Sequence, residues 1–209
     1  MAPEDMPVII LAAGASRRMR GADKLLEEVD GAPLLRRQVR NAIALGAGPV
    51  LVALPPAPHP RYNALDGLSY LPVPVADAQE GMNASIRAAF AALPPDALCA
   101  MLLLADLPDI TAEDLRTVAK AVDLLSDTLI WRGATEANSP GHPIIFRAML
   151  FEALRALTGD TGAKDVVTRA KDRVVLVPLE GDRARLDLDT PEAWEAWRRN
   201  TETRRPDEP

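Results

Sequence analysis

The chain has 209 residues, of which 48% are hydrophobic, and a formal net charge of −6. This length and apolar content indicate one domain, expected at residues 1–199, followed by a flexible charged tail at 200–209. The acidic balance argues against wholesale binding to nucleic acid or to a membrane surface, since both would require a basic face. The single cysteine excludes a disulfide framework. We expect a cytoplasmic protein without a cleaved leader or a membrane span.

Apolar runs alternate with segments of helical periodicity along the chain. The predicted strands are residues 8–13, 50–54, 69–73, 98–105, 128–131 and 174–177. Helices are predicted at residues 34–45, 83–93 and 112–125. The alternation predicts an α/β fold with three layers, in which helices flank a mostly parallel sheet. Ligands of such sheets bind beyond the carboxyl ends of the strands.

The first strand leads directly into a polar turn, residues 14–24, which holds the most specific signal in the chain. Backbone N–H groups in a turn of this kind form an anion nest. Arg17, Arg18 and Lys24 add positive charge for phosphate oxygens. The glycine spacing matches neither the dinucleotide fingerprint nor the P-loop. The turn therefore predicts a triphosphate site of another kind.

Residues 11–26, LAAGASRRMRGADKLL, resemble the signature of the MobA-like nucleotidyltransferases, which include molybdenum cofactor cytidylyltransferases and guanylyltransferases. The family form is LAAG or LAGG, a serine, Arg-Met-Gly and Lys-Leu-Leu, whereas this chain inserts Arg20 before Gly21. The resemblance implies a Rossmann-like fold of the nucleotide-diphospho-sugar transferase type. It implies that Lys24 stabilises charge at the α-phosphate and Arg18 at the departing pyrophosphate. It also implies a set of nucleotide-binding residues in the turn: Leu11, Ala12, Ala13, Gly14, Ser16 and Arg17.

An apolar strand that ends in Asp106 suggests a divalent metal site. Mg²⁺ usually binds one or two carboxylates together with substrate phosphates, although a strand-terminal aspartate can instead cap a turn. The resemblance implies the metal role, because the family has a matching Asp-x-Pro. It also implies that Asp187 or Asp189, from the segment DLDTPE, is the second ligand. Asp187 is slightly favoured, because Asp189 lies nearer the helix that Pro191 begins.

A second polar segment resembles the element that contacts the nucleotide base in the family. Gly81 and Ser85 match its Gly-x-x-x-Ser pattern, although an ordinary helix cap also explains them. Met82, between them, is expected in the core. The proline cluster at residues 55–60 is expected to form an exposed loop near the base.

Two later segments resemble the acceptor side of the family's site. One is the Gly-His-Pro around His142, and the other contains Asp160, Gly162 and Lys164. His142 can alternatively be a structural donor, and Asp160 can instead cap a helix at residues 163–170. Lys164 replaces the more usual arginine, which keeps the charge but loses the bidentate fork.

The combined interpretation is nucleotidyl transfer, in which an acceptor phosphate attacks the α-phosphorus of an NTP and pyrophosphate leaves. With Ala13 in LAAG, the resemblance favours CTP as donor and a molybdopterin-type acceptor, with Mg²⁺ as cofactor. A molybdoenzyme or its maturation chaperone is the expected protein partner. The alternatives are a guanylyl- or sugar-phosphate transferase, and a non-catalytic nucleotide-binding or cofactor-binding module. A dinucleotide-dependent oxidoreductase lacks its glycine fingerprint.

Overall fold

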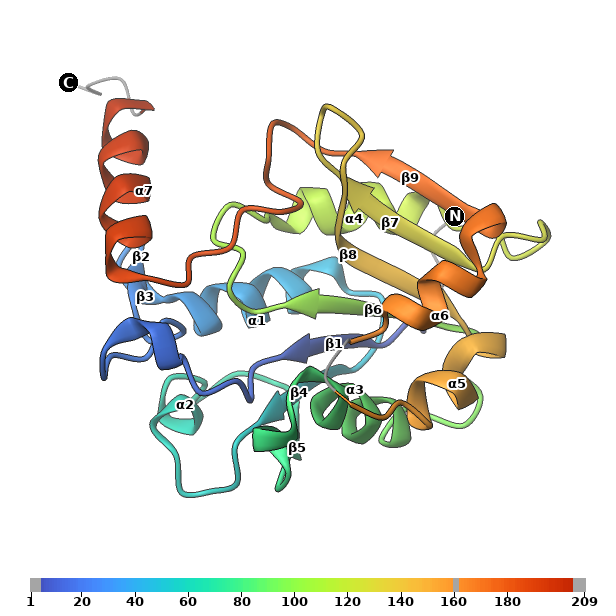
Figure 1. Ribbon diagram of the computed structural model, residues 1–209, viewed down its shortest axis with the longest axis horizontal. Helices are drawn as coiled ribbons and strands as arrows, with labels where there is room; N and C mark the ends of the chain where they lie inside the picture. Colours follow the sequence, from blue (N-terminus) through green and yellow to red (C-terminus); the bar gives the residue numbers. More distant parts are fainter. Residues whose placement is uncertain (1–4, 160–161, 205–209) are drawn as a thin grey trace.

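The computed structural model describes residues 5–159 and 162–204. A seven-stranded sheet runs through the centre of this part of the chain in the order β5-β4-β1-β6-β8-β7-β9 (Figure 1). Its strands are β1 (Val8–Leu11), β4 (Val50–Leu54), β5 (Leu71–Pro74), β6 (Cys99–Leu104), β7 (Ile130–Ala134), β8 (Pro140–Arg147) and β9 (Val174–Pro178). A small antiparallel sheet pairs β2 (Glu28–Val29) with β3 (Ala32–Pro33).

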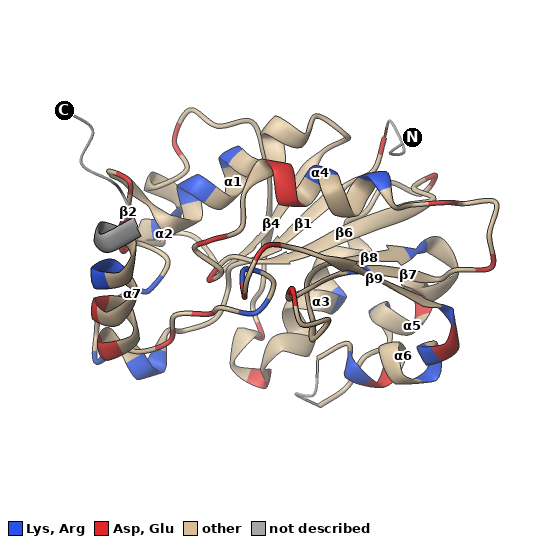
Figure 2. Ribbon diagram, turned by 90° about the horizontal axis from the view of Figure 1, so that it is seen from above, with Lys and Arg blue, Asp and Glu red and all other residues tan. Residues whose placement is uncertain are grey.

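Helices cover both faces of the large sheet. Figure 2 shows α1 (Leu34–Leu45) and α4 (Ala112–Lys120) on one face, and α3 (Met82–Ala91), α5 (Phe151–Arg155) and α6 (Lys164–Arg169) on the other. Strand β1 explains the layering: Val8 and Ile10 pack in the core on the α1 and α4 side, whereas Ile9 packs in the core on the α3 side. Because a strand buried on both faces must be apolar throughout, β1 shows no polar alternation. The predicted three-layer α/β fold is confirmed.

The sheet is mostly parallel, as predicted, because β1, β4, β5 and β6 form parallel pairs and so do β7 and β9. Strand β8 runs antiparallel to both β6 and β7. The sequence prediction omitted this strand, whose first four residues include Pro140, Gly141 and Pro143. Proline and glycine weaken a strand pattern, so the start of β8 has the composition of a turn.

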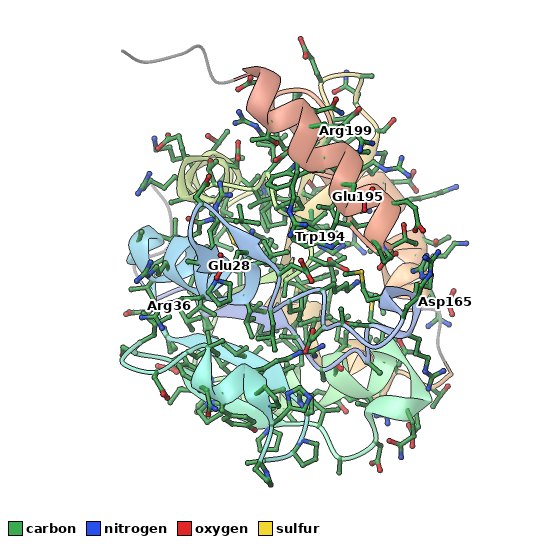
Figure 3. All side chains as sticks on the ribbon, turned by 90° about the vertical axis from the view of Figure 1, so that its left-hand side faces the viewer. Glu28, Arg36, Asp165, Trp194, Glu195 and Arg199 are labelled. Atoms are coloured by element: carbon green, nitrogen blue, oxygen red, sulfur yellow. The ribbon has the colours of Figure 1, made fainter. Side chains whose placement is uncertain are left out.

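The C-terminal end differs from the expected tail at residue 200. Helix α7 (Pro191–Arg204) continues past that residue, and residues 205–209 lie outside the described part. In Figure 3, Trp194 points from α7 into the protein, whereas Glu195 and Arg199 lie on its outer surface. Burial of Trp194, which is 1% exposed, anchors the helix. None of the described helices is long and apolar enough to cross a membrane.

Candidate active site

The turn after β1 is held in place by a buried arginine from a distant segment. Arg61, in α2 (Pro60–Asn63), is 2% exposed. Its Nη1 donates to the carbonyl of Ala12 at 2.5 Å, and its Nη2 donates to the carbonyl of Gly14 at 2.7 Å. The same guanidinium binds both carboxylate oxygens of Asp23, each at 2.7 Å. Because a guanidinium donates in a rigid fork, these contacts fix both ends of the turn at once.

Asp23 is the other half of this support. Its Oδ1 also accepts hydrogen bonds from the Ser16 hydroxyl at 3.2 Å and from the Leu25 amide at 3.0 Å. Burial alone would raise the pKa of Asp23, but the hydrogen bonds and charge of Arg61 outweigh it, so that pKa is lowered. The carboxylate is therefore ionised at neutral pH, and it stabilises Ser16, whose φ of 50° is left-handed.

Lys24 lies between two carboxylates, one from the middle of the chain and one from near its C-terminal end. Its Nζ is 2.5 Å from Oδ2 of Asp106 and 2.6 Å from Oδ1 of Asp189. Arg18 forms an ion pair with the other oxygen of Asp189. Burial would lower the pKa of Lys24, but the two carboxylates outweigh that effect and raise it. Two cations and two carboxylates thus form one cluster. The sequence placed all four in catalytic or metal roles, from three separate motifs.

The three aspartates at this cluster are not equivalent. Burial would raise the pKa of Asp189, but the hydrogen bond from Lys24 outweighs it and lowers that pKa. Burial raises the pKa of Asp187, and its hydrogen bond with the ionised Asp189 raises it further. The sequence argument that assigned Asp189 to the helix start is wrong, because the Thr190 hydroxyl accepts the Ala193 amide there at 3.2 Å.

These carboxylates are suited to bind a divalent cation whose remaining ligands come from the substrate. Oδ1 of Asp106 is buried and accepts no hydrogen bond in the described part of the chain. A buried carboxylate oxygen without a donor is suited to a cation. Within residues 5–159 and 162–204, no three His, Cys, Asp or Glu side chains are arranged to hold a metal by themselves. Such a site matches the usual coordination of Mg²⁺, which binds one or two carboxylates together with phosphate oxygens.

A pocket of about 830 Å³ opens beside this cluster, at the carboxyl ends of β1, β4 and β6. Every residue that the sequence assigned to catalysis or to the nucleotide lines it, together with Asp189: Leu11, Ala12, Ala13, Gly14, Ser16, Arg17, Arg18, Lys24, Gly81, Ser85 and Asp106. Pro55, Pro56 and His59 line it as well, so the proline cluster lies at the pocket. Asp187 is not among its lining residues.

The start of α3 forms one wall of the pocket. Gly81 precedes the helix with φ 106° and ψ −166°, a conformation that side chains rarely adopt, so glycine is required there. Ser85 is buried in the first turns of the helix. Met82 is 45% exposed and lines the pocket, so its expected place in the core is wrong. Its first-turn position leaves the side chain directed at the pocket instead of the sheet.

The acceptor-side residues are only partly brought to the site. Gly162 lies next to Met82, whose sulfur would be 3.3 Å from an added Cβ. Lys164 begins α6 and is exposed, and neither residue lines the pocket. Asp160 lies outside the described residues. The alternative helix at residues 163–170 is confirmed by α6.

His142 is partly buried near Asp106, with its Nδ1 atom buried, and it does not line the pocket. Its amide donates to the carbonyl of Ala184 at 2.7 Å. Burial, helped by the charge of Arg132, lowers the pKa of His142 to about 4, although the backbone of Leu102 and the charge of Asp106 oppose this shift. The imidazole is therefore neutral at physiological pH. A neutral imidazole is compatible with the alternative role of a structural hydrogen-bond donor.

Sequence reasoning missed Arg61, because its partners lie 38 to 49 residues away along the chain. The local signal was weak. His59 caps α2 by accepting the Arg61 amide at its Nδ1, 3.3 Å away, and Pro60 follows at the first helical position. This pattern predicts a helix start but gives no hint that the next side chain is buried.

Comparison with known proteins agrees with this geometry. Residues 8–174 match the MobA-like NTP transferase domain. The chain belongs to this family. The predicted enzyme class, a nucleotidyltransferase that acts on an NTP, is thereby confirmed at the level of the family.

Individual relatives share the fold along most of the chain. The bifunctional protein GlmU of Sorangium cellulosum strain So ce56 is 30% identical over 152 residues, which are 69% of this chain and 32% of GlmU, so the chain spans about a third of that relative. The homologue of Rv0371c from Mycobacterium sp. strain JC1 is 26% identical with a TM-score of 0.78, and the match covers 96% of this chain and 98% of the homologue. Rv0371c of Mycobacterium tuberculosis H37Rv is 26% identical with a TM-score of 0.74, covering 92% and 97%. A structure of Rv0371c in complex with manganese matches with a TM-score of 0.71.

Proposed function

We propose that this protein transfers the cytidylyl group of CTP to the terminal phosphate of a molybdopterin-type acceptor. An acceptor phosphate oxygen bonds to the α-phosphorus, the bond from that phosphorus to the bridging oxygen breaks, and pyrophosphate leaves. The observation that carries the proposal is the position of Lys24, which lies within 2.6 Å of both Asp106 and Asp189 at the mouth of the pocket. Cytidine and the acceptor class rest on the LAAG and EGMNAS segments, which resemble those of the cytidylyltransferases.

The charged residues at the pocket act on different parts of the triphosphate. The turn after β1 offers backbone N–H groups and Arg17 to the triphosphate, and Arg61 preorganises that turn. Lys24 moves its donors from the carboxylates to the α-phosphate, where charge accumulates during transfer. Arg18 neutralises the departing pyrophosphate. No covalent intermediate is required, so catalysis consists of positioning and charge neutralisation.

Asp106 and Asp189 are the residues that would hold a divalent cation, with Asp187 next to them. When bound, Mg²⁺ or a similar ion supplies charge neutralisation at the reacting phosphate oxygens. The manganese complex of Rv0371c supports the use of a divalent ion. We place Asp189 before Asp187 as the second ligand, because Asp189 lines the pocket and is ionised.

The test is a panel of CTP, GTP, UTP and ATP with Mg²⁺ or Mn²⁺, scored by thermal shift and then by pyrophosphate release with molybdopterin cofactor. CTP is expected to give the largest shift and the fastest release. Lys24→Ala and Asp106→Asn should each lower turnover at least about 10²-fold while the protein remains folded. Lys120→Ala, which removes a 68% exposed lysine on α4, is the matched control and should retain full activity. Turnover retained by both site variants contradicts the mechanism, and a preference for GTP contradicts the assignment of the base.

A further inference from the structure

Two amide side chains of helix α1 hold the turn that follows Asp106. Gln38 donates from Nε2 to the carbonyl of Leu107 at 2.7 Å, and Asn41 donates from Nδ2 to the carbonyl of Ile110 at 2.9 Å. Residues with this spacing lie on the same side of a helix. The two hydrogen bonds therefore fasten both ends of the turn to one face of α1.

Gln38 occupies a position that the helical pattern reserves for an apolar side chain. It is 0% exposed. The other residues that α1 buries are apolar: Leu34, Leu35, Val39 and Ala42. The Oε1 atom of Gln38 is also buried, and in the described part of the chain it accepts no hydrogen bond. Burial of an amide oxygen without a donor lowers stability. A residue that breaks the local pattern at such a cost is typical of a functional site.

Attachment of the turn to α1 does not require Gln38. The side chains of Leu107 and Ile110 are 1% and 0% exposed, and they belong to the same core cluster as the apolar residues of α1. Asn41 supplies a hydrogen bond to the turn as well. What Gln38 adds is a restraint on the residue that directly follows Asp106.

The backbone at Asp106 needs this restraint, because it lies beyond the end of β6. Its own carbonyl accepts from the Leu188 amide at 3.4 Å, which is long for a hydrogen bond. The bond from Gln38 to the Leu107 carbonyl, at 2.7 Å, is short and within the usual range. The position of the Asp106 carboxylate therefore depends strongly on Gln38.

A divalent cation is sensitive to that position. Oδ2 of Asp106 is 2.5 Å from Nζ of Lys24, so the buried Oδ1 is the oxygen that remains for a cation. Mg²⁺ requires oxygen ligands at about 2.0–2.1 Å in a near-ideal octahedron. Loss of a group that orients a metal ligand typically weakens metal affinity or activity by about 10–100-fold.

We propose that Gln38 is a positioning residue for the divalent cation, and that it acts through the Leu107 carbonyl to hold the Asp106 carboxylate in the orientation that binds the ion. The inference rests on the proposed function and adds a residue that contacts neither the substrate nor the cation. Gln38 does not line the nucleotide pocket. Its removal should therefore weaken the cation and leave metal-free nucleotide binding unchanged.

The test measures Mn²⁺ binding to the complex of the protein with CTP, by EPR, from the loss of the free-ion signal. No acceptor is present, so no transfer occurs, and a blank with CTP alone accounts for the ion that the nucleotide holds. Gln38→Met keeps an unbranched side chain of similar length but removes the donor and the unpartnered oxygen. It should weaken Mn²⁺ binding at least about tenfold. Its melting temperature should stay close to the wild-type value, because removal of the unpartnered oxygen offsets the lost hydrogen bond.

Asn41→Leu is the matched control. It removes the neighbouring amide-to-carbonyl hydrogen bond from the same helix to the same turn, but at Ile110 instead of beside Asp106. Its Mn²⁺ affinity should equal that of the wild type. Both variants should also retain the thermal shift that CTP gives without metal.

Wild-type Mn²⁺ affinity in Gln38→Met overturns the proposal. Equal weakening by Asn41→Leu does so too, because it would reflect a general loosening of the turn. If Gln38→Met does not fold, Gln38→Leu, which matches the apolar residues beside it, is judged by the same measurement. Absence of Mn²⁺ binding to the wild-type complex rejects both this role and the cation site. Failure to release pyrophosphate with molybdopterin cofactor, in a protein that binds Mn²⁺ and CTP, refutes only the proposed function.

Discussion

Replacement of Arg61 by alanine tests whether the nucleotide turn depends on long-range support. The change removes five side-chain hydrogen bonds, to Ala12, Gly14, Ser16 and both oxygens of Asp23. Breaking a buried ion pair by removing one partner costs about 3–5 kcal/mol, because the remaining charge is left without compensation. Asp23 is 20% exposed and keeps its bonds from Ser16 and Leu25, so the lower end applies. We expect the free energy of unfolding to fall by about 3 kcal/mol.

The measurements are urea and thermal unfolding, followed by NTP-induced thermal shift. For a chain of this length, the stability loss corresponds to a melting temperature lower by about 6–12 °C. Arg36→Ala is the matched control, because within residues 5–159 and 162–204 Arg36 donates only to the carbonyls of Ala64 and Asp66 and has no buried carboxylate partner. Figure 3 places Arg36 at the periphery of the molecule. The control should lose no more than about 1 kcal/mol and should keep its NTP response.

A double-mutant cycle separates the ion pair from the effect on the turn. In Arg61→Ala with Asp23→Ala, no unpaired carboxylate remains, so at least about 1 kcal/mol of the loss should be recovered. The NTP response should not recover, because the carbonyls of Ala12 and Gly14 still lack their donors. The reasoning is refuted if the free energy of unfolding of Arg61→Ala lies within about 1 kcal/mol of the wild-type value, as is expected for the control. It is also refuted if Arg61→Ala binds NTP as the wild type does.

Two further predictions concern β8. Because the pKa of His142 falls from 6.5 to about 4 on folding, the unfolded chain binds more protons than the folded protein between those pH values. The neutral imidazole therefore contributes about 3 kcal/mol to the free energy of unfolding above pH 6.5, and this contribution is lost as the pH falls to 4. In urea unfolding, His142→Gln should therefore lose less stability than the wild type as the pH falls from 6.5 to 4. An equal change in the free energy of unfolding with pH for both proteins would contradict a neutral imidazole in the folded protein. Gly141→Ala should destabilise by more than about 2 kcal/mol, because its Cβ would lie 2.1 Å from a backbone oxygen. Gly14→Ala, which meets nothing within 4 Å, should melt as the wild type does.

The parts of the site that the sequence predicted are those with a local signal. The turn from Gly14 to Lys24 follows a strand that is buried on both faces, and Asp106 follows another. Because adjacent parallel strands end at the same edge of the sheet, two motifs 82 residues apart could be expected to meet there. The contact between Lys24 and Asp106 bears out that expectation.

The parts that the sequence did not predict depend on partners far away in the chain. Nothing near Arg61 in the sequence distinguishes a buried arginine from a solvated one, because burial is decided by the elements that pack over it. The choice between Asp187 and Asp189 as metal ligand stays a prediction, but the helix-start argument behind the slight preference for Asp187 does not hold. Helix-start arguments count only neighbouring residues, whereas Asp189 is held by Lys24, 165 residues earlier.

Helix α7 shows how the far end of the chain contributes to the same site. The helix follows Asp189 directly, so the position of that carboxylate depends on how α7 is anchored. Trp197 donates from its indole N–H to Asp109 at 2.9 Å, and Asp109 belongs to the turn that follows Asp106. Arg198 binds Glu27, just beyond the nucleotide turn, at 2.6 Å. One helix thus contacts the segments that carry Lys24 and Asp106 while it begins beside Asp189.

This arrangement assigns a positional role to residues for which the sequence pattern indicates no function. The ion pair between Arg20 and Glu192, at 2.6 Å, is exposed at both ends and contributes little energy by itself. Its geometric effect is larger, because it joins the inserted arginine of the nucleotide turn to the first turn of α7. The inserted Arg20, which departs from the family signature, therefore links the turn to the helix that follows Asp189. The departure leaves Arg18 and Lys24 in contact with Asp189, where the proposed transfer reaction places their charges.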